Sequence, residues 1–565
     1  MSSKALTLGL IAASLGLASQ AHASGFDAPN VGSQKSGPVT RDATAVHHNP
    51  GQLGYLDRGD VVFGAGVIVG ALSYERERRG AYQFSDNLDF AEPIDPADID
   101  PSKTGVDRKV NTLPAGPIGD VFVAVPVIEE RFTLGAGIYV PYAAILDLPA
   151  DGPQRFSAQS VTLLSANATL AAGVKLHDVI SIGAGVSYVF SMMELSKVQD
   201  FGAVGVFGDG LAADPISQDN DFGVDAPSTV RELDVLARQV DIEKGISHGI
   251  SFNAGVAIRP TDALDLALVY QHGSRVRLRG KFTLNMDDEF FTQDLAAQGL
   301  QYPPLVEGDA DIEFSLPKRI TAGAGYRIGP KLSLELMGSY VFYQDFDTIR
   351  IKLTSPELAQ PALGIGESVD QDLVRNWVGT GHVETTARIR PIERLEVSAL
   401  AGYQSSASPN STVDMASPDG HRLIFGAGVG WSFNERWSIY GDFEGQAIIP
   451  RQVVDSDFDL GNGRYTLFLS QLSVHAQVRF GVGGKRRKNA PTSGEGEGEG
   501  ADAERAAGEP ASADDPSGVD REPRPESQGR DTTPQAPDAA PSQPGASPTA
   551  SDRKPPPPPP PPPPA

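Results

Sequence analysis

Apolar and polar residues alternate with a period of two along most of the chain between Gly59 and Phe480. The last segment shows the pattern clearly, since its two parities are Leu472, Val474, Ala476, Val478 and Phe480 against Ser473, His475, Gln477 and Arg479. Alternation of this kind places apolar side chains on one face of a β-strand and polar side chains on the other. A soluble β-sandwich with one buried face would show the same pattern, so alternation predicts strands without choosing their architecture.

The connections between these segments favour one architecture. About fourteen segments follow one another, among them 178–196, 247–260, 263–284 and 310–328, each predicted as a single strand. Short connections such as Gly329-Pro330 alternate with long ones such as 197–246 and 285–309. Bacterial outer-membrane barrels join their strands by short periplasmic turns and longer extracellular loops, whereas a sandwich has no reason to lengthen every second connection. We therefore expect an all-β fold, a 14-stranded antiparallel transmembrane β-barrel in the outer-membrane lipid.

The first residues predict export from the cytoplasm. Lys4 precedes an apolar stretch over 5–18, and Ala21-His22-Ala23 has the small-residue pattern of a cleavage site. This order is typical of a secretory signal peptide, which we place at 1–23. The apolar stretch is shorter than the roughly 20 residues that a helix needs to cross a bilayer. Export together with a barrel predicts localisation in the bacterial cell outer membrane.

Three further regions differ in composition. Residues 24–58 are small and polar without periodicity, which fits either a plug inside the barrel or a disordered linker, and 59–480 form the predicted barrel. Residues 481–565 form a Pro- and acid-rich tail that ends in a proline run over 555–564. A segment of this composition cannot bury a core, so we expect disorder. An even number of strands places the tail in the periplasm, as a peptidoglycan or partner contact or as a solubilising extension.

Composition narrows the chemistry. The chain has no cysteine, which removes disulfides, thiolate metal sites and cysteine nucleophiles, and its formal charge of -25 argues against nucleic acid as a partner. Neither G-x-S-x-G nor H-E-x-x-H occurs, so we expect no catalytic residues, no cofactor and no enzymatic activity. The pair His47-His48 has no nearby carboxylate or cysteine constellation, which favours packing and hydrogen bonding over metal binding.

Several short stretches resemble the FadL-type outer-membrane transporters. The start Ser24-Gly25-Phe26 is similar to that family's small-Gly-Phe start, and 42–53, with Asn49-Pro50 at its centre, resembles its D-A-S-A-x-x-x-N-P-A-x-L segment. The stretch 134–142 is similar to the family's L-G-x-G-x-x-x-P-F/Y pattern. Two further short motifs stand where the family has similar ones, namely Leu316-Pro317-Lys318-Arg319-Ile320 and Arg375-Asn376-Trp377. The resemblance covers about residues 24–480.

The resemblance implies a barrel of fourteen strands whose lumen is plugged by an N-terminal hatch, here 24–58. It also implies passive transport of hydrophobic small molecules such as long-chain fatty acids or aromatic hydrocarbons. Asn49, Pro50 and Gly51 are then hatch residues, although the family usually has alanine where Gly51 stands. A kink in the third strand opens the wall toward the membrane in this family, and Pro141 is the candidate for it here. The alternative is that Pro141 marks the point where this strand leaves the membrane.

The candidate cargo contacts are aromatic and aliphatic residues in two long connections and at the hatch. Apolar residues exposed in a loop usually mark contact with a ligand, a membrane or a protein. These loops could equally pack on each other to close the barrel mouth. By the family resemblance, the hatch's N-terminus also contacts cargo. The candidates are Gly25, Phe26, Phe201, Phe207, Phe290, Phe291 and Leu295.

A fatty-acid carboxylate would require a cation inside the barrel, for which strand parity or position offers Arg319, Arg388 and Arg479. These arginines could equally pair with lumen carboxylates such as Asp442 and Glu444. Two other functions stay open at this level. A general diffusion porin for small polar solutes would show large, steady conductance, which a plugged barrel lacks. A surface-binding or structural barrel would show neither conductance nor cargo binding.

Overall fold

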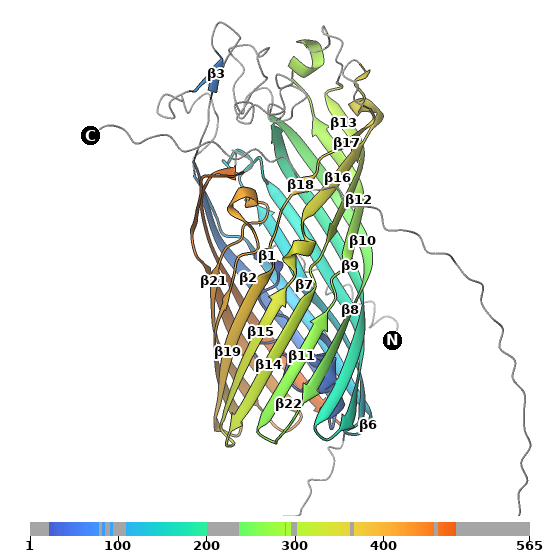
Figure 1. Cartoon of the computed structure of the whole chain (residues 1–565), viewed down its shortest axis with the longest axis vertical. Helices are drawn as coiled ribbons and strands as arrows, with labels where there is room; N and C mark the ends of the chain where they lie inside the picture. Colours follow the sequence, from blue (N-terminus) through green and yellow to red (C-terminus); the bar gives the residue numbers. More distant parts are fainter. Residues whose placement is uncertain are drawn as a thin grey trace, which may run out of the picture. The chain divides into compact units, whose positions relative to one another are not determined.

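A computed structural model describes residues 22–77, 82–84, 91–93, 109–200, 237–288, 290–294, 296, 302–361, 366–456 and 461–481. Within them the chain forms a closed barrel of 14 antiparallel strands (Figure 1). In chain order the strands are β2 (Gly59–Arg76), β5 with β6 (Lys109–Thr112, Ala115–Ile128), β7 (Phe132–Asp147), β8 (Ser160–His177), β9 (Ile180–Asp200), β10 (Ala237–Ile258), β11 with β12 (Leu264–Gln271, Arg275–Asn285), β13 with β14 (Leu305–Ser315, Arg319–Ile328), β15 with β16 (Leu332–Val341, Thr348–Thr354), β17 and β18 with β19 (Ser368–Asp370, Leu373–Val374, Thr380–Ile392), β20 (Leu395–Gln404), β21 (Arg422–Ser432), β22 with β23 (Trp437–Ile448, Arg451–Val453) and β24 (Gly463–Phe480).

The first and last barrel strands close the sheet. β2 pairs with β24 over their whole lengths, from Gly59 opposite Phe480 to Arg76 opposite Gly463. Closure matters because lipid offers no hydrogen-bond partner to an unpaired strand edge. The predicted 14-stranded antiparallel barrel is thus confirmed. Gly59 leaves room for the ring of Phe480, since a Cβ there would lie 2.3 Å from a ring carbon.

Smaller elements lie before the barrel and in its connections. They are β1 (His22–Asp27), α2 (Ala45–His48), η1 (Pro50–Tyr55), the two-stranded sheet of β3 (Tyr82–Phe84) and β4 (Ala91–Pro93), η5 (Phe290–Asp294), η6 (Tyr343–Asp345), η7 (Pro356–Leu358) and η9 (Asn410–Thr412). In the described part of the chain, no helix has the length and apolar character needed to cross a bilayer.

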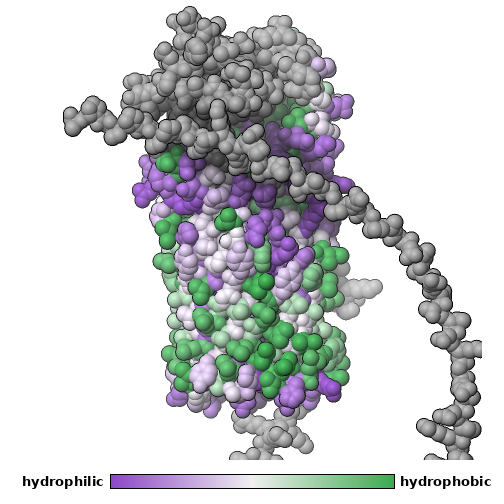
Figure 2. All heavy atoms as spheres, in the orientation of Figure 1, coloured by the Kyte–Doolittle hydropathy of each residue, from purple (hydrophilic) through white to green (hydrophobic). Residues whose placement is uncertain are grey.

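The two halves of the barrel have opposite polarity. In the half with the short turns, outward side chains are apolar and inward ones are polar: on β15 Leu334 is exposed and Glu335 is buried. In the half with the long connections the order is reversed, since Val276 and Leu278 of β12 are buried while Arg277 is exposed. Figure 2 shows apolar residues over the lower wall and a hydrophilic band above them. The lower band suits the hydrocarbon of a membrane, and the upper half projects beyond it.

In two of the strands this reversal coincides with a break and with a change in which parity faces outward. The predicted single strands 263–284 and 310–328 are wrong in this detail, because each consists of two strands separated at 272–274 and at 316–318. Outward residues are even-numbered on β11, as at Leu268, and odd-numbered on β12, as at Arg275. A one-residue slip exchanges the two faces of a strand. The same period-two pattern therefore continues while inside and outside change places.

The strands also extend further than predicted. β9 runs to Asp200 and β10 begins at Ala237, so the predicted connection 197–246 is too long at both ends. The reason is again the reversal of polarity between the two halves of the barrel. Val240 and Ile242 of β10 are apolar and face inward, while the residue between them is polar. A sequence prediction that looks for strands with an apolar outer face therefore ends each strand at the membrane boundary.

The inward apolar side chains of the projecting half form one large buried cluster. It includes Leu163, Met193, Leu195, Phe282, Phe314, Phe346 and Trp377. The interior of this barrel is thus apolar in its outer half, whereas at membrane depth inward polar side chains surround a smaller apolar cluster between the hatch and the wall, which includes Val46, Leu53 and Phe122.

Candidate functional site

The segment from Ala28 to Arg58, which we call the hatch, lies against the inner wall of the barrel. Its η1 helix packs on three wall glycines, Gly173, Gly183 and Gly255, which face one another across β8, β9 and β10. A Cβ on Gly183 would lie 2.3 Å from the carbonyl carbon and oxygen of Pro50. Glycine permits this close approach because it has no side chain. We call these three residues the glycine row.

Polar side chains from around the wall hold the hatch in place. Asn253 donates to the carbonyls of Val46 and His47 at 2.9 and 3.1 Å, and the hydroxyl of Ser181 donates to the carbonyl of Gly51 at 2.6 Å. On other sides Asp60 accepts from the Ala43 amide, Asp120 from the Gly32 amide, and Arg41 pairs with Asp265. Because these anchors come from strands all around the barrel, the hatch is fixed as a plug.

The predicted hatch residues lie at this contact. Asn49 is fully buried, and its amide donates to the carbonyl of Pro38 at 2.9 Å and accepts from the Gly51 amide at 3.0 Å. Gly51 has no space for the alanine that is usual in the resembling family, because a Cβ would lie 2.8 Å from the carbonyl oxygen of Gly255. Here the wall approaches the hatch at Gly51, which the sequence did not indicate.

The third barrel strand is irregular at Pro141. Tyr139 pairs with Asn167 and Tyr142 with Ser165, so β7 has one residue more than β8 between these pairs, which is a β-bulge. Pairing between β6 and β7 reaches only Ile138 opposite Val121. Beyond it β1 lies along β7, and the Ala28 amide donates to the carbonyl of Pro141 at 2.9 Å. A seam in the wall at Pro141 is therefore lined by the N-terminal strand.

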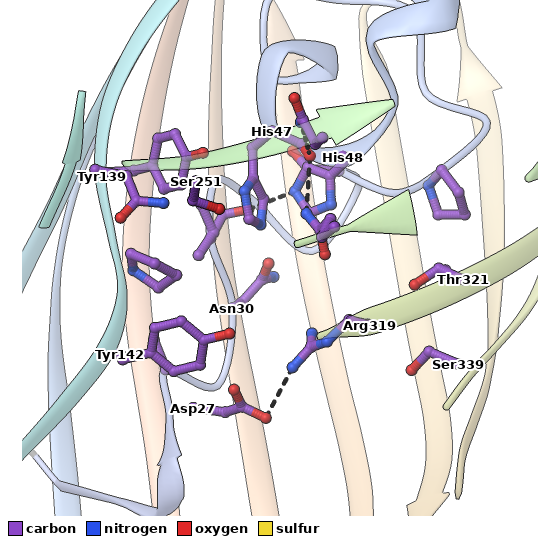
Figure 3. A pocket seen from close by; sticks show the side chains of 18 of the residues that line it. Asp27, Asn30, His47, His48, Tyr139, Tyr142, Ser251, Arg319, Thr321 and Ser339 are labelled. Carbon is purple, nitrogen blue, oxygen red and sulfur yellow. Dashed lines mark hydrogen bonds and ion pairs between the residues drawn. The ribbon is translucent and has the colours of Figure 1, made fainter. Parts of the chain in front are cut away.

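A cavity of about 150 Å³, which we call the inner cavity, lies between the hatch and this seam. Tyr139, Pro141 and Tyr142 form one side of its lining, and Arg319 reaches in from β14 (Figure 3). The guanidinium of Arg319 pairs with Asp27 at 2.8 Å, so its charge is neutralised. The charge of Arg319 in the lining of the inner cavity is therefore compensated by Asp27.

His47 and His48 line the same cavity from the hatch. Burial lowers the pKa of His47 well below its ordinary value, and His48 and Arg319 lower it further. Burial also lowers the pKa of His48, although the Val31 carbonyl and two carboxylates partly oppose this. The Nε2 of His48 lies 2.8 Å from the Val31 carbonyl and must donate to it. Both imidazoles are thus neutral at pH 7. Among the described residues no cluster of three or more metal-ligating side chains occurs.

A second cavity, of about 570 Å³, lies in the projecting half of the barrel. We call it the outer cavity. Its wall is largely aliphatic and aromatic, with Phe156, Val161, Leu163, Met193, Leu195, Phe314, Phe346 and Ile349 among its lining residues. The strands β8, β9, β13 and β16, the connection 411–417, and Ser456 and Gly461 contribute to it. The reversal of polarity therefore places a largely apolar chamber inside the projecting half of the barrel.

Two cations enter this apolar chamber. Arg375 is buried and pairs with Asp414 at 2.6 Å, which neutralises it. Lys197, on the inward parity of β9, lines the cavity and has no ion pair within the described ranges. Asp370, Asp372 and Asp414 also line this cavity, but Lys197 makes no direct ion pair with any of them. Its ammonium group is therefore available to an anionic group supplied by a ligand.

The predicted cargo residues are distributed unevenly. Phe201, Phe207 and Leu295 lie outside the described residues, as do the predicted leader up to residue 21 and the tail from 482 on. Gly25 and Phe26 belong to β1, and Phe290 belongs to η5, whose side chain at this position is not described. Phe291 is buried in the apolar cluster near Tyr302, and Arg238 lies 5.6 Å above its ring centre. The role of these residues in binding cargo stays a prediction.

The three arginines predicted as candidate cations do not line the outer cavity. Arg319 and Arg388 pair with Asp27 and Glu335, and Arg479 lies near Gln477 at the turn end. Lys197 was missed because the predicted strand ended at residue 196. A usable signal was present, since Leu195 and Lys197 continue the inward parity of Met193.

Comparison with known proteins agrees with this arrangement. Residues 11–459 match the family model described as outer membrane protein transport protein (OMPP1/FadL/TodX). The chain belongs to this family. It is therefore an outer-membrane transport protein, and its family is one of transporters, not of enzymes.

The relatives are distant in sequence. The long-chain fatty acid transport protein of Escherichia coli O6:H1 is 21% identical over 409 residues, covering 71% of this chain and 80% of that protein. A FadL homologue from Pseudomonas aeruginosa has a TM-score of 0.62 at 18% identity, covering 82% of this chain and 99% of the other. The toluene transporter TodX of P. putida has a TM-score of 0.52 at 13% identity, covering 79% and 98%. At such identities the structures show a shared fold.

Proposed function

We propose that this protein carries long-chain fatty acids, or hydrophobic molecules with a similar carboxylate head, across the outer membrane by passive passage. The observation that carries the proposal is the outer cavity, which combines an apolar wall with the cation of Lys197. Its volume of about 570 Å³ falls in the roughly 300–1,000 Å³ range of ligand pockets.

The energetics favour an amphiphile. Each buried methylene contributes about 0.8 kcal/mol, so ten of them supply about 8 kcal/mol before the cost of ordering the chain. The carboxylate adds a charge-assisted hydrogen bond of roughly 1.5–3 kcal/mol if Lys197 receives it. An aromatic hydrocarbon would gain only the first contribution. This difference supports a fatty acid over the cargo named for TodX.

The seam offers a route from the inner cavity to the membrane. The inner cavity lies next to Pro141, where β6 and β7 separate and β1 lines the gap. Displacement of β1 would connect this cavity with the lipid outside, so we propose the seam as a lateral exit. The hatch, which packs on the glycine row and is held by its polar anchors, blocks the straight path to the periplasm.

Binding to purified protein tests the proposal. Palmitate and toluene are titrated against the wild type, the Lys197→Met variant and the control Lys352→Met, whose lysine lies exposed on β16 near the same cavity. Lys197→Met should weaken palmitate binding by about 10-fold or more, as loss of a charged hydrogen bond predicts, and leave toluene unaffected. The control should bind palmitate like the wild type. Equal palmitate affinity in all three proteins would refute the role of Lys197.

The two alternative functions give other results. A general diffusion porin would show large, steady conductance in planar bilayers and no saturable palmitate binding. A surface-binding or structural barrel would show neither. The docked hatch favours the carrier over the porin, because its anchors occupy the lumen at membrane depth.

A further inference from the structure

The outer surface of the projecting half carries charged stripes on three neighbouring strands. Each stripe has mainly one sign of charge, and cross-strand pairing places opposite signs side by side. The basic stripes are Arg275, Arg277, Arg279 and Lys281 on β12 and Arg350 and Lys352 on β16, and the acidic stripe between them is Glu307, Asp309, Asp311 and Glu313 on β13.

The charges balance far from the membrane but not near it. Toward the loops Arg279 pairs with Asp311 at 3.5 Å and Lys281 with Asp309 at 2.5 Å. Toward the membrane one carboxylate, Glu313, meets three guanidinium groups. They are Arg275, Arg277 at 3.0 Å and Arg350 at 3.7 Å.

These three arginines, which we call the arginine patch, keep two positive charges in excess. Within the described ranges Glu313 is the one carboxylate at ion-pair distance from them. Their side chains are 57%, 63% and 66% exposed, whereas Val276 and Leu278 between them face the interior. The patch therefore faces away from the lumen and takes no part in binding cargo there.

The arginine patch lies beside the upper end of the apolar outer wall. The amide of Arg277 donates to the hydroxyl of Ser247 at 2.9 Å, which places it next to His248. Further down β10, Ile250 and Phe252 are exposed. Figure 2 shows this change from apolar to hydrophilic surface along the wall.

Aromatic pairs mark the same level of the wall. The hydroxyl of Tyr188 lies 2.6 Å from His248 Nδ1, and Tyr270 and Tyr403 make equivalent contacts with His272 and His421 at 2.8 and 2.7 Å. Amphipathic rings are typical of the boundary between hydrocarbon and headgroups. The arginine patch thus stands where lipid headgroups begin.

We propose that Arg275, Arg277 and Arg350 bind phosphate groups of lipid headgroups in the outer leaflet. Guanidinium forks match phosphate oxygens in geometry and charge, and the two uncompensated charges lie at headgroup depth. The balanced pairs further out, Arg279–Asp311 and Lys281–Asp309, link neighbouring strands of the projecting sheet, which no lipid covers. The partner is a phosphorylated lipid because the patch adjoins the apolar wall on which its acyl chains lie.

Native mass spectrometry of the full-length protein in detergent tests this proposal with phosphorylated lipid A and with the same lipid freed of phosphate. The variant Arg275→Gln/Arg277→Gln should lose roughly 30-fold in affinity for the phosphorylated form, from about five-fold per arginine. The control Arg279→Gln/Lys281→Gln removes the same charge from the same strand and should bind like the wild type. Both variants should keep the heat-dependent gel migration of a folded barrel, since the altered side chains are exposed.

The variant Glu313→Gln should change the affinity for phosphorylated lipid A in the opposite direction. Removing the single carboxylate should tighten binding of phosphorylated lipid A, whereas a merely structural ion pair predicts no gain. Equal losses in the test and control variants would overturn the proposal in favour of general attraction. It would also be overturned by equal binding of the dephosphorylated lipid, or by inorganic phosphate binding as tightly as the lipid.

Discussion

Replacing Gly183 with alanine should loosen the hatch from the barrel wall. The new Cβ would lie 2.3 Å from the carbonyl carbon and oxygen of Pro50 and 2.6 Å from the amide nitrogen of Gly51. All three atoms belong to the backbone, so no side chain can rotate away. Ordinary contact between carbon atoms needs at least about 3.5 Å, and η1 must therefore move by about 1 Å.

The cost follows from this overlap. Overpacking by one methyl group typically costs about 1–3 kcal/mol, and a shift of η1 also stretches the 2.6 Å hydrogen bond from Ser181 to Gly51. Because 1.4 kcal/mol is a factor of ten in an equilibrium constant, the undocked fraction should rise roughly 5- to 150-fold. Gly381→Ala is the matched control, since a Cβ at this wall position meets nothing within 4 Å.

Single-channel conductance in planar bilayers measures the undocked fraction as leak events, and protease cleavage within residues 28–58 reports it independently. We expect both to increase for Gly183→Ala and to stay at the wild-type level for Gly381→Ala. If the two variants behave alike, although both migrate as folded barrels, the glycine row does not hold the hatch.

Three further predictions concern the hatch and the seam. Asn49→Ala removes a buried amide with bonds to Pro38 and Gly51 and should raise protease cleavage of the hatch, since each unsatisfied group costs about 1–3 kcal/mol; cleavage equal to wild type would contradict this. Lowering the pH from 7 to 5 should weaken docking, because an undocked hatch takes up protons on His47 and His48 below about pH 6.5 while burial keeps the docked imidazoles neutral. Leak conductance should therefore rise toward pH 5 and stay constant above pH 7, and a flat profile would exclude this linkage. Pro141→Ala restores a backbone donor at the seam and should slow palmitate uptake by cells without changing palmitate affinity; unchanged uptake would count against the lateral exit.

Local alternation revealed which side chains of a strand face lipid, but not where along the strand the inward and outward parities are exchanged. Between Leu268 and Arg275 the outward parity moves from even to odd numbers, and this depends on a single irregular connection at 272–274. A period-two pattern looks identical on either side of such a slip. The apolar wall of the outer cavity was therefore not visible from the sequence, whereas Lys197 could have been found by extending the inward parity of β9 beyond residue 196.

The sequence by itself determined the barrel, its antiparallel order and the number of its strands, because alternation and connection length are local properties. Tertiary structure decided the rest. The glycine row forms only when Gly173, Gly183 and Gly255 meet across three strands. The arginine patch likewise gathers Arg277 and Arg350 from strands separated by more than seventy residues. Close approach and charge balance depend on which strands become neighbours, and closure of the sheet decides that.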